Sequence, residues 1–448
     1  MTVTVVWVRR DLRMRDHPAL TAAADAGDSV LPLFVLDPRL VDRATPRRDH
    51  LLASLRALDD AMDGHLVVRR GRPEQVVAAV ADEVGAETVH VTAESTPYGR
   101  RRDERVRRRL ERDGRSLVAT GTPYAVGPGT LTKADGTAYQ VFTPFSKAWR
   151  AHGWPAPAPM PRGLRWARAD SEGLPEGPAL DGAGEEAARR RWRRWLDQHL
   201  GDYDGERDRP DLDSTSRMSV PLKYGELHPR TLLADIAAHE GARSTAARTY
   251  TNELCWREFY ADVLWHHPES AWHDLKPALS SMRYSRARKP LEAWQRGETG
   301  YPMVDAGMRQ LLAEGWMHNR VRMITASFLV KDLHIWWPEG ARHFLAHLRD
   351  GDIASNNHGW QWVAGTGTDA APYFRVFNPV SQGLKFDPAG DYVRRWVPEL
   401  RHLKGKAAHE PWEHDDGYAQ GYPERIVDHR AEREEALRRY EEARRTGS

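Results

Sequence analysis

Between residues 349 and 369 the chain concentrates side chains that can do chemistry, in the order RDGDIASNNHGWQWVAGTGTD. The reactive groups are two carboxylates, an amide and two indoles, contributed by Asp350, Asp352, Asn356, Trp360 and Trp362. Carboxylates and amides orient a polar ligand through hydrogen bonds, and indoles offer large flat faces for stacking. We therefore expect this stretch to line a pocket for a large heteroaromatic ligand.

Two more sets of residues place similar groups on one face of a helix. In each set the spacing is i, i+3, i+4, which brings three side chains to the same side. The sets are Glu253, Trp256 and Arg257, and Asn319, Arg322 and Met323. A single face of this kind is more simply interpreted as a half-solvated surface with an incidental ion pair. Two such faces, added to the first stretch, favour the heteroaromatic pocket.

The elements that must position these groups change along the chain. Up to about residue 120, short β-branched runs alternate with helical segments rich in Ala, Leu and Arg. The runs that we predict as strands span residues 2–8, 29–37, 65–70, 88–94 and 116–120. Alternation with almost continuously apolar strands predicts a parallel sheet wrapped by helices. Ligands bind at the carboxyl ends of such strands, although no G-x-G-x-x-G fingerprint follows the first one.

Past this region the sequence is rich in turns and then, over residues 153–184, in Pro and Gly, as a connector is. From about residue 185 the periodicity is helical, with no strand-like alternation. The predicted fold class is thus α/β, an N-terminal Rossmann-like parallel sheet domain plus a C-terminal all-helical domain. The expected domains are an α/β domain over 1–125, a connector over 126–185 and a helical domain over 186–448.

Bulk composition narrows the classes of partner. The net charge is only +2, so any nucleic-acid footprint must be local. The arginine runs near residues 100 and 190 are better explained as solvated helix faces. One cysteine, Cys255, excludes a disulfide framework and fits a reducing cytoplasm. We expect no signal peptide and no membrane span, because the apolar runs are too short.

Other kinds of chemistry find little support. His266 and His267 adjoin each other but lack metal-ligand spacing, so we expect no metal site. A Ser/His/Asp hydrolase would need a nucleophile elbow, and the sequence contains none. Tryptophan is in surplus, with 17 residues, which indicates an aromatic ligand, stacked bases or a path for electrons.

Several long blocks then resemble the DNA photolyase/cryptochrome family, in order and along nearly the whole chain. They are RRDLRMRDHPAL (9–20), VFTPFSKAW (141–149), TSRMS (215–219), NELCWREFY (252–260), TGYPMVDAGMRQL (299–311), GWMHNRVRM (315–323), and the first stretch continued through APYFRVFNP (371–379). By this resemblance the chain is identified as a member of the class I branch, the cyclobutane pyrimidine dimer (CPD) photolyases. The resemblance implies an α/β antenna domain, a connector, and a helical catalytic domain holding FAD.

The resemblance also implies which residues hold FAD. Those that match its contacts are Tyr203, Thr215, Ser216, Arg217, Met218, Ser219, Arg257, Asn319, Arg322, Asp350, Gly351, Asp352 and Asn356. The turn at 215–219 would cradle the diphosphate. Arg322 would pair with Asp350 beside the flavin ring, and Asn356 matches the residue that faces flavin N5. An amide there, in place of the Asp or Cys of cryptochromes, favours repair over signalling.

On the substrate side the resemblance implies DNA containing a pyrimidine dimer that has left the helix. Photolyases are a standard example of such base flipping. Trp256 and Trp362 match two indoles that wedge against the dimer, and Glu253 matches the group that hydrogen-bonds its base edge. Met323 favours the cyclobutane lesion, since (6-4) photolyases carry histidine there. Further DNA contacts are expected at Arg207, Asn319, Arg320, Arg375 and Lys385.

Two departures from the family pattern concern light. Trp360 and Trp337 match the inner and middle tryptophans of the photoreduction chain, whereas Tyr284 stands where the outer one is found. The antenna chromophore is expected to be 8-hydroxy-5-deazaflavin, with the folate methenyltetrahydrofolate as the alternative. The residues expected to line its pocket are Phe34, Leu36, Asp37, Arg48, Glu94 and Lys223, with Glu94 in place of the usual Asp.

The leading interpretation is a light-driven lyase in which reduced FAD passes an electron to the dimer, which splits into monomers. We expect a cytoplasmic monomer. Two alternatives stay open: a cryptochrome that signals through a partner, and a flavoprotein that binds DNA without repairing it. Asn356 and the two dimer indoles argue against the first, and loss of dimers only under light would separate all three.

Overall fold

The computed structural model describes residues 2–41, 43–276, 279, 281–368 and 375–446. Residues 369–374, which include the start of the block APYFRVFNP, lie outside the described residues. The chain forms two compact units. Unit 1 consists of residues 1–139, 143–201 and 216–268, and unit 2 of residues 140–142, 202–215 and 269–448.

Unit 1 is built on a five-stranded parallel sheet. Its strands are β1 (Val3–Val8), β2 (Ser29–Leu36), β3 (Val67–Arg70), β4 (Thr88–Val91) and β5 (Ser116–Ala119), in the spatial order β3-β2-β1-β4-β5. All four pairings are parallel, as the apolar runs predict. The first strand is central, and its side chains from Thr4 to Val8 are buried.

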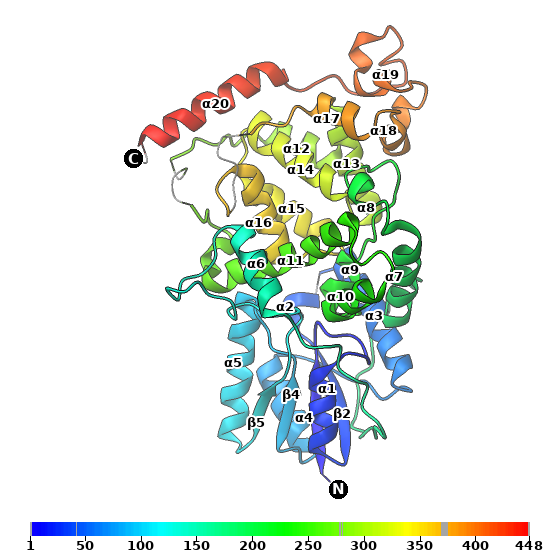
Figure 1. Ribbon diagram of the computed structural model, residues 1–448, viewed down its shortest axis with the longest axis vertical. Helices are drawn as coiled ribbons and strands as arrows, with labels where there is room; N and C mark the ends of the chain where they lie inside the picture. The colour runs from blue at the N-terminus through cyan, green and yellow to red at the C-terminus, as the bar shows by residue number, and fades with distance from the viewer. Residues whose placement is uncertain (1, 42, 277–278, 280, 369–374, 447–448) are drawn as a thin grey trace. The chain divides into compact units, whose positions relative to one another are not determined.

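Helices connect the strands of this sheet. They are α1 (Pro18–Ala26), α2 (Pro38–Val41), α3 (Pro46–Ala61), α4 (Pro73–Glu83) and α5 (Pro97–Arg112), all labelled in Figure 1. Each of them starts at a proline. Proline suits the first helical position because its fixed φ fits the helix and its missing N–H would have no partner there. Threonine N-caps, Thr45 and Thr96, precede α3 and α5. The hydroxyl of each accepts a hydrogen bond from a backbone N–H of the first helical turn.

The Pro- and Gly-rich connector lies between α6 (Phe142–His152) and α7 (Glu185–His199) and contains no helix. It is not detached from unit 1, since Val30 of β2 exchanges backbone hydrogen bonds with Arg165 and Ala167 at 2.9 Å each. Unit 1 also contains α9 (Ser219–Tyr224), α10 (Pro229–Ala238) and α11 (Thr245–His266). Tyr250 of α11 packs against Trp195 of α7, with ring centroids 4.5 Å apart.

Unit 2 is helical throughout its described residues. Its α-helices are α8 (Tyr203–Glu206), α12 (Arg288–Arg296), α13 (Pro302–Glu314), α14 (Asn319–Ser327), α15 (Trp337–His347), α16 (Ile353–Ala364), α17 (Pro379–Phe386), α18 (Asp391–Trp396), α19 (Lys406–His409) and α20 (His429–Thr446). Shorter turns are the 3-10 segments η1 (Pro268–Ala271), which begins at the last residue of unit 1, η4 (Pro398–Leu400) and η5 (Pro411–Glu413), and the π-helical η3 (Phe328–Asp332). Its core is rich in aromatic side chains, with Trp294, Trp337 and Phe344 fully buried.

The α/β sheet and the helical C-terminal region agree with the predicted fold class. The compact units, however, have boundaries that composition does not suggest. Helices α7 and α9 to α11 belong to the same unit as the sheet, although their sequences have helical periodicity throughout. Among the described residues, no helix combines the length and the apolar character that crossing a bilayer requires.

Candidate functional site

In unit 2, Arg322 and Asp350 form a largely buried ion pair. Arg322 lies on α14 and Asp350 in the turn between α15 and α16. The guanidinium Nη2 is 2.8 Å from the carboxylate Oδ2, and its Nε donates to the carbonyl of Met317 at 2.8 Å. The side chain of Asp350 is only 1% exposed. The ion pair that the sequence analysis expects is therefore present, with both partners held in place.

Two of the predicted FAD contacts carry a buried polar atom that has no partner among the described residues. The second carboxylate oxygen of Asp350, Oδ1, is buried and accepts no hydrogen bond from any described residue. The hydroxyl of Thr215 is likewise buried without a partner in the described part of the chain. A buried polar group left unsatisfied costs about 1–3 kcal/mol. Both residues are predicted FAD contacts, and both atoms fit a ligand rich in hydroxyl and phosphate groups.

The turn after Asp350 starts helix α16. Asp352 is its N-cap, and Oδ1 accepts from the backbone N–H groups of Ala354 and Ser355 at 3.1 Å each. Gly351 is buried beside it. The carboxylate of Asp352 therefore has a structural duty, which is to fix the first turn of the helix that carries Asn356 and the two indoles.

Asn356 is half-buried, and its amide has a defined orientation. Nδ2 donates to the carbonyl of Ala341 at 3.2 Å and to Oδ1 of Asn357 at 2.8 Å. The fully buried Asn357 in turn donates its own Nδ2 to the carbonyl of Ala271. Because backbone carbonyls only accept, both amides are fixed, and Asn356 offers its carbonyl oxygen to a ligand. Asn356 is predicted from the sequence, whereas nothing in the sequence marks the role of Asn357 in orienting it.

The two indoles of α16 lie in different surroundings. Trp360 is 2% exposed and packs against Phe344, with centroids 4.9 Å apart in an edge-to-face arrangement. Trp362 is half-buried at the margin of the same core, and so is Met323 of α14. Trp362 and Met323 can therefore contact a ligand, whereas Trp360 belongs to the protein interior.

Trp337, the predicted middle tryptophan, is fully buried at the start of α15. Its Nε1 donates to Oδ1 of Asp274 at 2.6 Å. Asp274 carries no signal in the sequence, because it lies 63 residues away in an irregular segment. Tyr284 is half-buried, and burial, followed by the charge of Asp274, raises its pKa.

The predicted DNA contacts of unit 2 include several partly exposed cations. Arg320 is bound to Asp208, with Nη2 to Oδ2 at 2.8 Å, and lies 4.6 Å from the ring of Phe386. Lys385 approaches the same ring at 5.1 Å and is exposed. Arg375 is exposed as well. Arg320 can thus offer a phosphate only the donors that Asp208 leaves, whereas Lys385 and Arg375 reach solvent.

The remaining expected contacts of unit 2 lie at helix ends. Asn319 is exposed at the first position of α14, one turn before Arg322. Tyr203 is buried at the start of α8, and the guanidinium of Arg207 lies 5.8 Å from its ring. The phenol ring of Tyr203 is therefore packed against the protein, and the guanidinium of Arg207 lies over it.

In unit 1, helix α11 presents Glu253, Trp256 and Arg257 as half-buried neighbours on one face. Trp256 packs against Tyr260, with centroids 5.4 Å apart. Arg257 donates to the carbonyls of Pro123 and Leu222 at 3.0 and 3.1 Å. Its guanidinium thus ties three segments of unit 1 together, a structural role that sequence reasoning did not foresee.

The turn before α9 contains the predicted diphosphate contacts of unit 1. Arg217 has a left-handed backbone conformation, with φ 55°. The hydroxyl of Ser216 shares a hydrogen bond with the phenol of Tyr250 at 2.8 Å and accepts from the N–H of Met218 at 3.3 Å. Ser219, the first residue of α9, is exposed. The conformation of the turn is therefore stabilised by the hydroxyl of Ser216 and by Tyr250 of α11.

The expected antenna residues gather at the carboxyl ends of the strands, also in unit 1. Phe34 and Leu36 of β2 are buried, and Asp37, which follows, accepts a hydrogen bond from the phenol of Tyr98. Arg48 and Lys223 are half-buried. Such an edge is where ligands of parallel sheets bind.

Glu94, the remaining residue expected at the antenna pocket, makes hydrogen bonds within its own loop. Its carboxylate accepts from the N–H groups of Ser95 and Thr96 at 2.8 and 3.1 Å, and Arg10 lies 3.6 Å away. Burial opposes its ionisation, but the arginines around it, Arg10 first, outweigh burial and lower the pKa of Glu94 to about 2. The carboxylate of Glu94 therefore stabilises its own loop through the N–H groups of Ser95 and Thr96.

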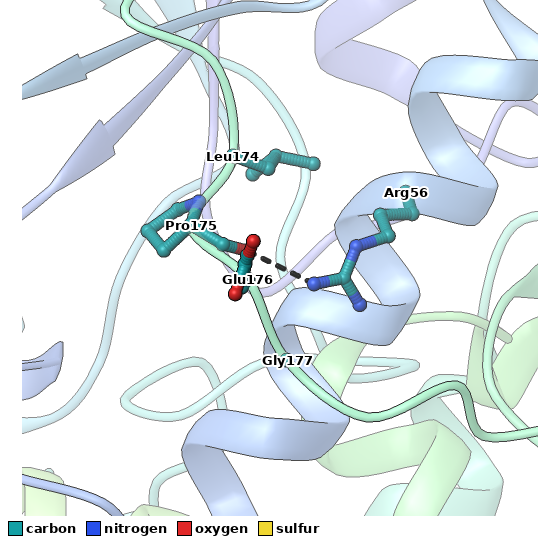
Figure 2. Close-up of a pocket in the computed structure, with 5 residues that line it drawn as sticks. All are labelled: Arg56, Leu174, Pro175, Glu176 and Gly177. Atoms are coloured by element: carbon teal, nitrogen blue, oxygen red, sulfur yellow. Dashed lines mark hydrogen bonds between the residues drawn. The ribbon is translucent and has the colours of Figure 1, made fainter.

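A shallow hollow elsewhere on unit 1 lies apart from these residues. Arg56, Leu174, Pro175, Glu176 and Gly177 line it, and Figure 2 shows Arg56 donating to the carbonyl of Pro175 at 2.9 Å. It holds none of the predicted site residues. In the part of the chain that the structure describes, no three His, Cys, Asp or Glu side chains converge to bind a metal ion.

Comparisons with known proteins agree on one family. Residues 4–162 match the family described as DNA photolyase, and residues 250–442 match the FAD binding domain of DNA photolyase. The chain is 42% identical over 463 aligned residues to the deoxyribodipyrimidine photo-lyase of Streptomyces griseus, with 99% of both chains covered.

Solved structures show the same likeness. A class III photolyase from Agrobacterium tumefaciens superposes with a TM-score of 0.91 at 36% identity, covering 99% of this chain and 98% of that one. A cryptochrome from Synechocystis gives a TM-score of 0.90 at 28% identity, with coverage of 98% and 99%.

Proposed function

The chain belongs to the DNA photolyase/cryptochrome family, and we propose that it is the class I member of that family that acts on the cyclobutane pyrimidine dimer. The activity is light-dependent DNA repair with FAD, and the protein is an enzyme, a deoxyribodipyrimidine photo-lyase by its relatives. Bound FAD supplies the one-electron redox chemistry that light drives. The protein supplies binding, orientation and electrostatics.

The observation that carries the site assignment is the Arg322–Asp350 pair with its unpartnered oxygen. Arg322 donates to one carboxylate oxygen of Asp350 at 2.8 Å, and the other oxygen is buried without a donor among the described residues. The fixed cation favours a reduced, anionic flavin beside it. The amide oxygen of Asn356 is available to accept a hydrogen bond from an N–H group of the flavin ring, because its Nδ2 already donates to two protein acceptors. We assign both residues to the flavin ring on this basis.

The rest of the FAD set follows the same resemblance. Thr215, with its unpartnered hydroxyl, and Ser216, Arg217, Met218 and Ser219 are assigned to the diphosphate. Backbone N–H groups and hydroxyls in a turn suit phosphate oxygens. The other assigned contacts are Tyr203, Arg257, Asn319, Gly351 and Asp352.

For the lesion, we assign Trp256 and Trp362 as the stacking walls, with Glu253 and Met323 as direct contacts. All four are half-buried, which leaves each of them surface with which to touch a ligand. A damaged pair stacks poorly, so that extruding it costs less than extruding an intact base. Arg207, Asn319, Arg320, Arg375 and Lys385 are assigned to the DNA backbone, where cations set affinity and register.

We propose further that residues 1–125 form an antenna domain, 126–185 a connector and 186–448 the catalytic domain. The buried edge at Phe34, Leu36 and Asp37, with Arg48, Glu94 and Lys223, is assigned to an 8-hydroxy-5-deazaflavin, with methenyltetrahydrofolate as the alternative. Trp360, Trp337 and Tyr284 are assigned to photoreduction. A cytoplasmic monomer is proposed, which the DNA substrate and the single free thiol support.

A direct experiment uses the FAD-loaded protein, reduced chemically, and an oligonucleotide with one cyclobutane thymine dimer. Dimers should disappear in blue light and persist in the dark. Trp256→Phe and Trp362→Phe should weaken binding of damaged DNA, because a phenyl ring stacks over a smaller area than an indole does. The loss should be smaller than the about 1–3 kcal/mol that removal of a stacking ring costs. Trp154→Phe is the matched control, because this half-buried indole packs on Trp149, 4.3 Å away between centroids, outside the assigned site.

A cryptochrome is the second candidate, because a cryptochrome superposes nearly as well as a photolyase does. This candidate would be favoured if dimers persist both in the light and in the dark, although FAD is bound and is reduced by light. Binding of damaged DNA without repair would instead favour a non-catalytic flavoprotein.

A further inference from the structure

The buried indoles of unit 2 differ in what receives their N–H group. Trp337 donates to the carboxylate of Asp274 at 2.6 Å. Trp294 donates to the backbone carbonyl of Thr325 at 3.0 Å. The Nε1 of Trp360 is buried and has no acceptor among the described residues. Of these three indoles, only Trp337 is hydrogen-bonded to a group that can bind a proton.

This difference matters once an indole loses an electron. The oxidised indole carries a positive charge, and its N–H becomes strongly acidic. A carboxylate at hydrogen-bond distance stabilises that charge and can accept the proton. A backbone carbonyl stabilises the charge weakly and does not become protonated, and an indole without an acceptor has neither form of help.

We propose that Asp274 is the proton acceptor that traps an oxidised Trp337, and so gives the electron path its direction from Trp337 to Trp360. The inference rests on the proposed photoreduction path. In it, Trp360 gives one electron to the light-excited oxidised flavin. Trp337 then gives one electron to Trp360, which returns to the neutral indole. The Nε1 proton of Trp337 moves to Oδ1 of Asp274, which leaves a neutral indolyl radical and a carboxylic acid.

The surroundings of Asp274 suit this role. Burial raises its pKa and makes it a stronger base, while the donor groups of Trp337, Thr366 and Trp336 act in the opposite direction without cancelling burial. The charge of Asp274 also reaches Tyr284, whose pKa it helps to raise. Burial is the larger cause of the raised pKa of Tyr284, and it opposes loss of the phenol proton both before and after Asp274 is protonated. The electron hole therefore rests at Trp337.

The test is flash photolysis of the oxidised, FAD-loaded protein, with the absorption of the indole radicals as the readout. The parent should first show the cation form and then the neutral form, and the conversion should slow in D2O. In Asp274→Asn the amide oxygen can still accept the hydrogen bond, but it does not take the proton. The neutral-radical phase should be lost, and the cation should decay by return of the electron.

Asp235→Asn is the matched control, because Asp235 accepts from the indole of Trp192 at 2.8 Å in unit 1, away from the path. It should leave the conversion unchanged. Identical kinetics in the parent and in Asp274→Asn would overturn the role of Asp274 while leaving the path intact. An unchanged radical signal in Trp337→Phe, or no indole radical in the parent, would overturn the path and this inference with it.

A second measurement covers a variant that fails to fold or to bind FAD. The light-minus-dark infrared spectrum of the parent protein should gain the carbonyl band of a newly protonated carboxylic acid. The band should shift when aspartate is labelled with 13C, and it should be missing in Trp337→Phe. A parent spectrum without this band would overturn the proposal.

Discussion

At the scale of single residues, the site depends on a charge that the protein buries and only half satisfies. Asp350 is 1% exposed, and Arg322 satisfies one of its two oxygens. A buried carboxylate that loses its only cation is strongly destabilising, because neither water nor another group replaces the lost interaction. The pair therefore stabilises the folded state, and this contribution can be measured separately from its proposed role toward the flavin.

Arg322→Met should lower the free energy of unfolding of the FAD-free protein by about 3 kcal/mol, the low end for a broken buried pair since the arginine is partly exposed. Arg322→Met combined with Asp350→Asn should recover most of that loss, because no unpaired charge is left. Urea denaturation provides the measurement.

The control for this cycle is Arg309→Met, which breaks the more exposed pair with Glu399, joined at 2.7 Å. It should cost roughly 1 kcal/mol or less, as partly exposed pairs do. Equal denaturation midpoints for the parent and Arg322→Met would show that the charge of Asp350 does not depend on Arg322.

Tyr284 offers a second test at this scale. Phenol is harder to oxidise than indole unless its proton leaves, and burial together with Asp274 raises the pKa of Tyr284. Tyr284→Trp should therefore speed photoreduction of the oxidised protein in blue light with an external thiol. Repair by chemically pre-reduced protein should not change. Flavin absorbance follows the first rate, and equal photoreduction in both proteins would remove Tyr284 from the path.

At the scale of elements, helix α16 is the part that most of the site depends on. It carries Asn356, Trp360 and Trp362, and Asp352 caps its first turn. The cap and the predicted cofactor contact are the same carboxylate. Stability and FAD affinity therefore have to be separated by the choice of substitution.

Asp352→Ala should lower the free energy of unfolding by about 1 kcal/mol, as loss of an N-cap does, whereas Asp352→Ser should keep most of the stability. If the carboxylate also binds FAD, both variants should bind FAD more weakly. Thr45→Ala, which removes the cap of α3, should lose stability without loss of FAD. Calorimetry of unfolding and FAD titration give the two numbers. Full FAD affinity in Asp352→Ser would restrict Asp352 to the capping role.

The C-terminal helix α20 is attached to η3 by titratable groups. Asp332 accepts from His429, and His334 bonds Glu432 at 2.7 Å. Burial raises the pKa of Asp332 to about 6, more than the hydrogen bond from His429 lowers it. In an unfolded chain an aspartate titrates near about 3.9. Between these values the folded protein binds more protons than the unfolded one, so its stability falls as pH rises.

Asp332→Asn should remove this contribution. Relative to the variant, the parent should lose up to about 3 kcal/mol between pH 4 and pH 6, at about 1.4 kcal/mol per pKa unit. Unfolding by urea at a series of pH values measures it, with the exposed Asp391→Asn as the control. Parallel curves for the parent and Asp332→Asn would contradict the assignment.

The elements also show how far the sequence could be interpreted. The sequence predicts the bounds of all five strands to within a few residues. Strands of a parallel sheet are buried on both faces, and they therefore appear in the sequence as short, almost continuously apolar runs. The pairing of Arg322 with Asp350 was expected from a family resemblance and is present. By contrast, Asp274 reaches Trp337 from 63 residues away, and no periodicity marks it.

The hydrogen-bond partners of individual side chains were harder to predict from the sequence than the positions of the helices. The amide of Asn356 is oriented by the carbonyls of Ala341 and, through Asn357, of Ala271, which only tertiary packing brings near. Arg257 and Glu94 were expected at ligand pockets. Arg257 joins two backbone segments through the carbonyls of Pro123 and Leu222, and Glu94 accepts from the N–H groups of the two residues that follow it. Sequence motifs suggest which residues to consider, whereas the hydrogen bonds that each side chain makes depend on tertiary packing.

At the scale of the whole molecule, the function follows from family membership. The chain belongs to the DNA photolyase/cryptochrome family, and residues 250–442 match the FAD binding domain of DNA photolyase. The activity is light-dependent DNA repair with FAD. That function has a stoichiometric consequence, because an electron lent to the dimer comes back after the ring has split.

The most direct measurement is therefore the number of dimers that each FAD repairs. The FAD-loaded protein is reduced once, freed of reductant under nitrogen, and illuminated with excess dimer-containing oligonucleotide. The account predicts many dimers repaired per FAD, none in the dark, and cofactor that stays reduced. One dimer or fewer per FAD, or loss of dimers without light, would contradict it.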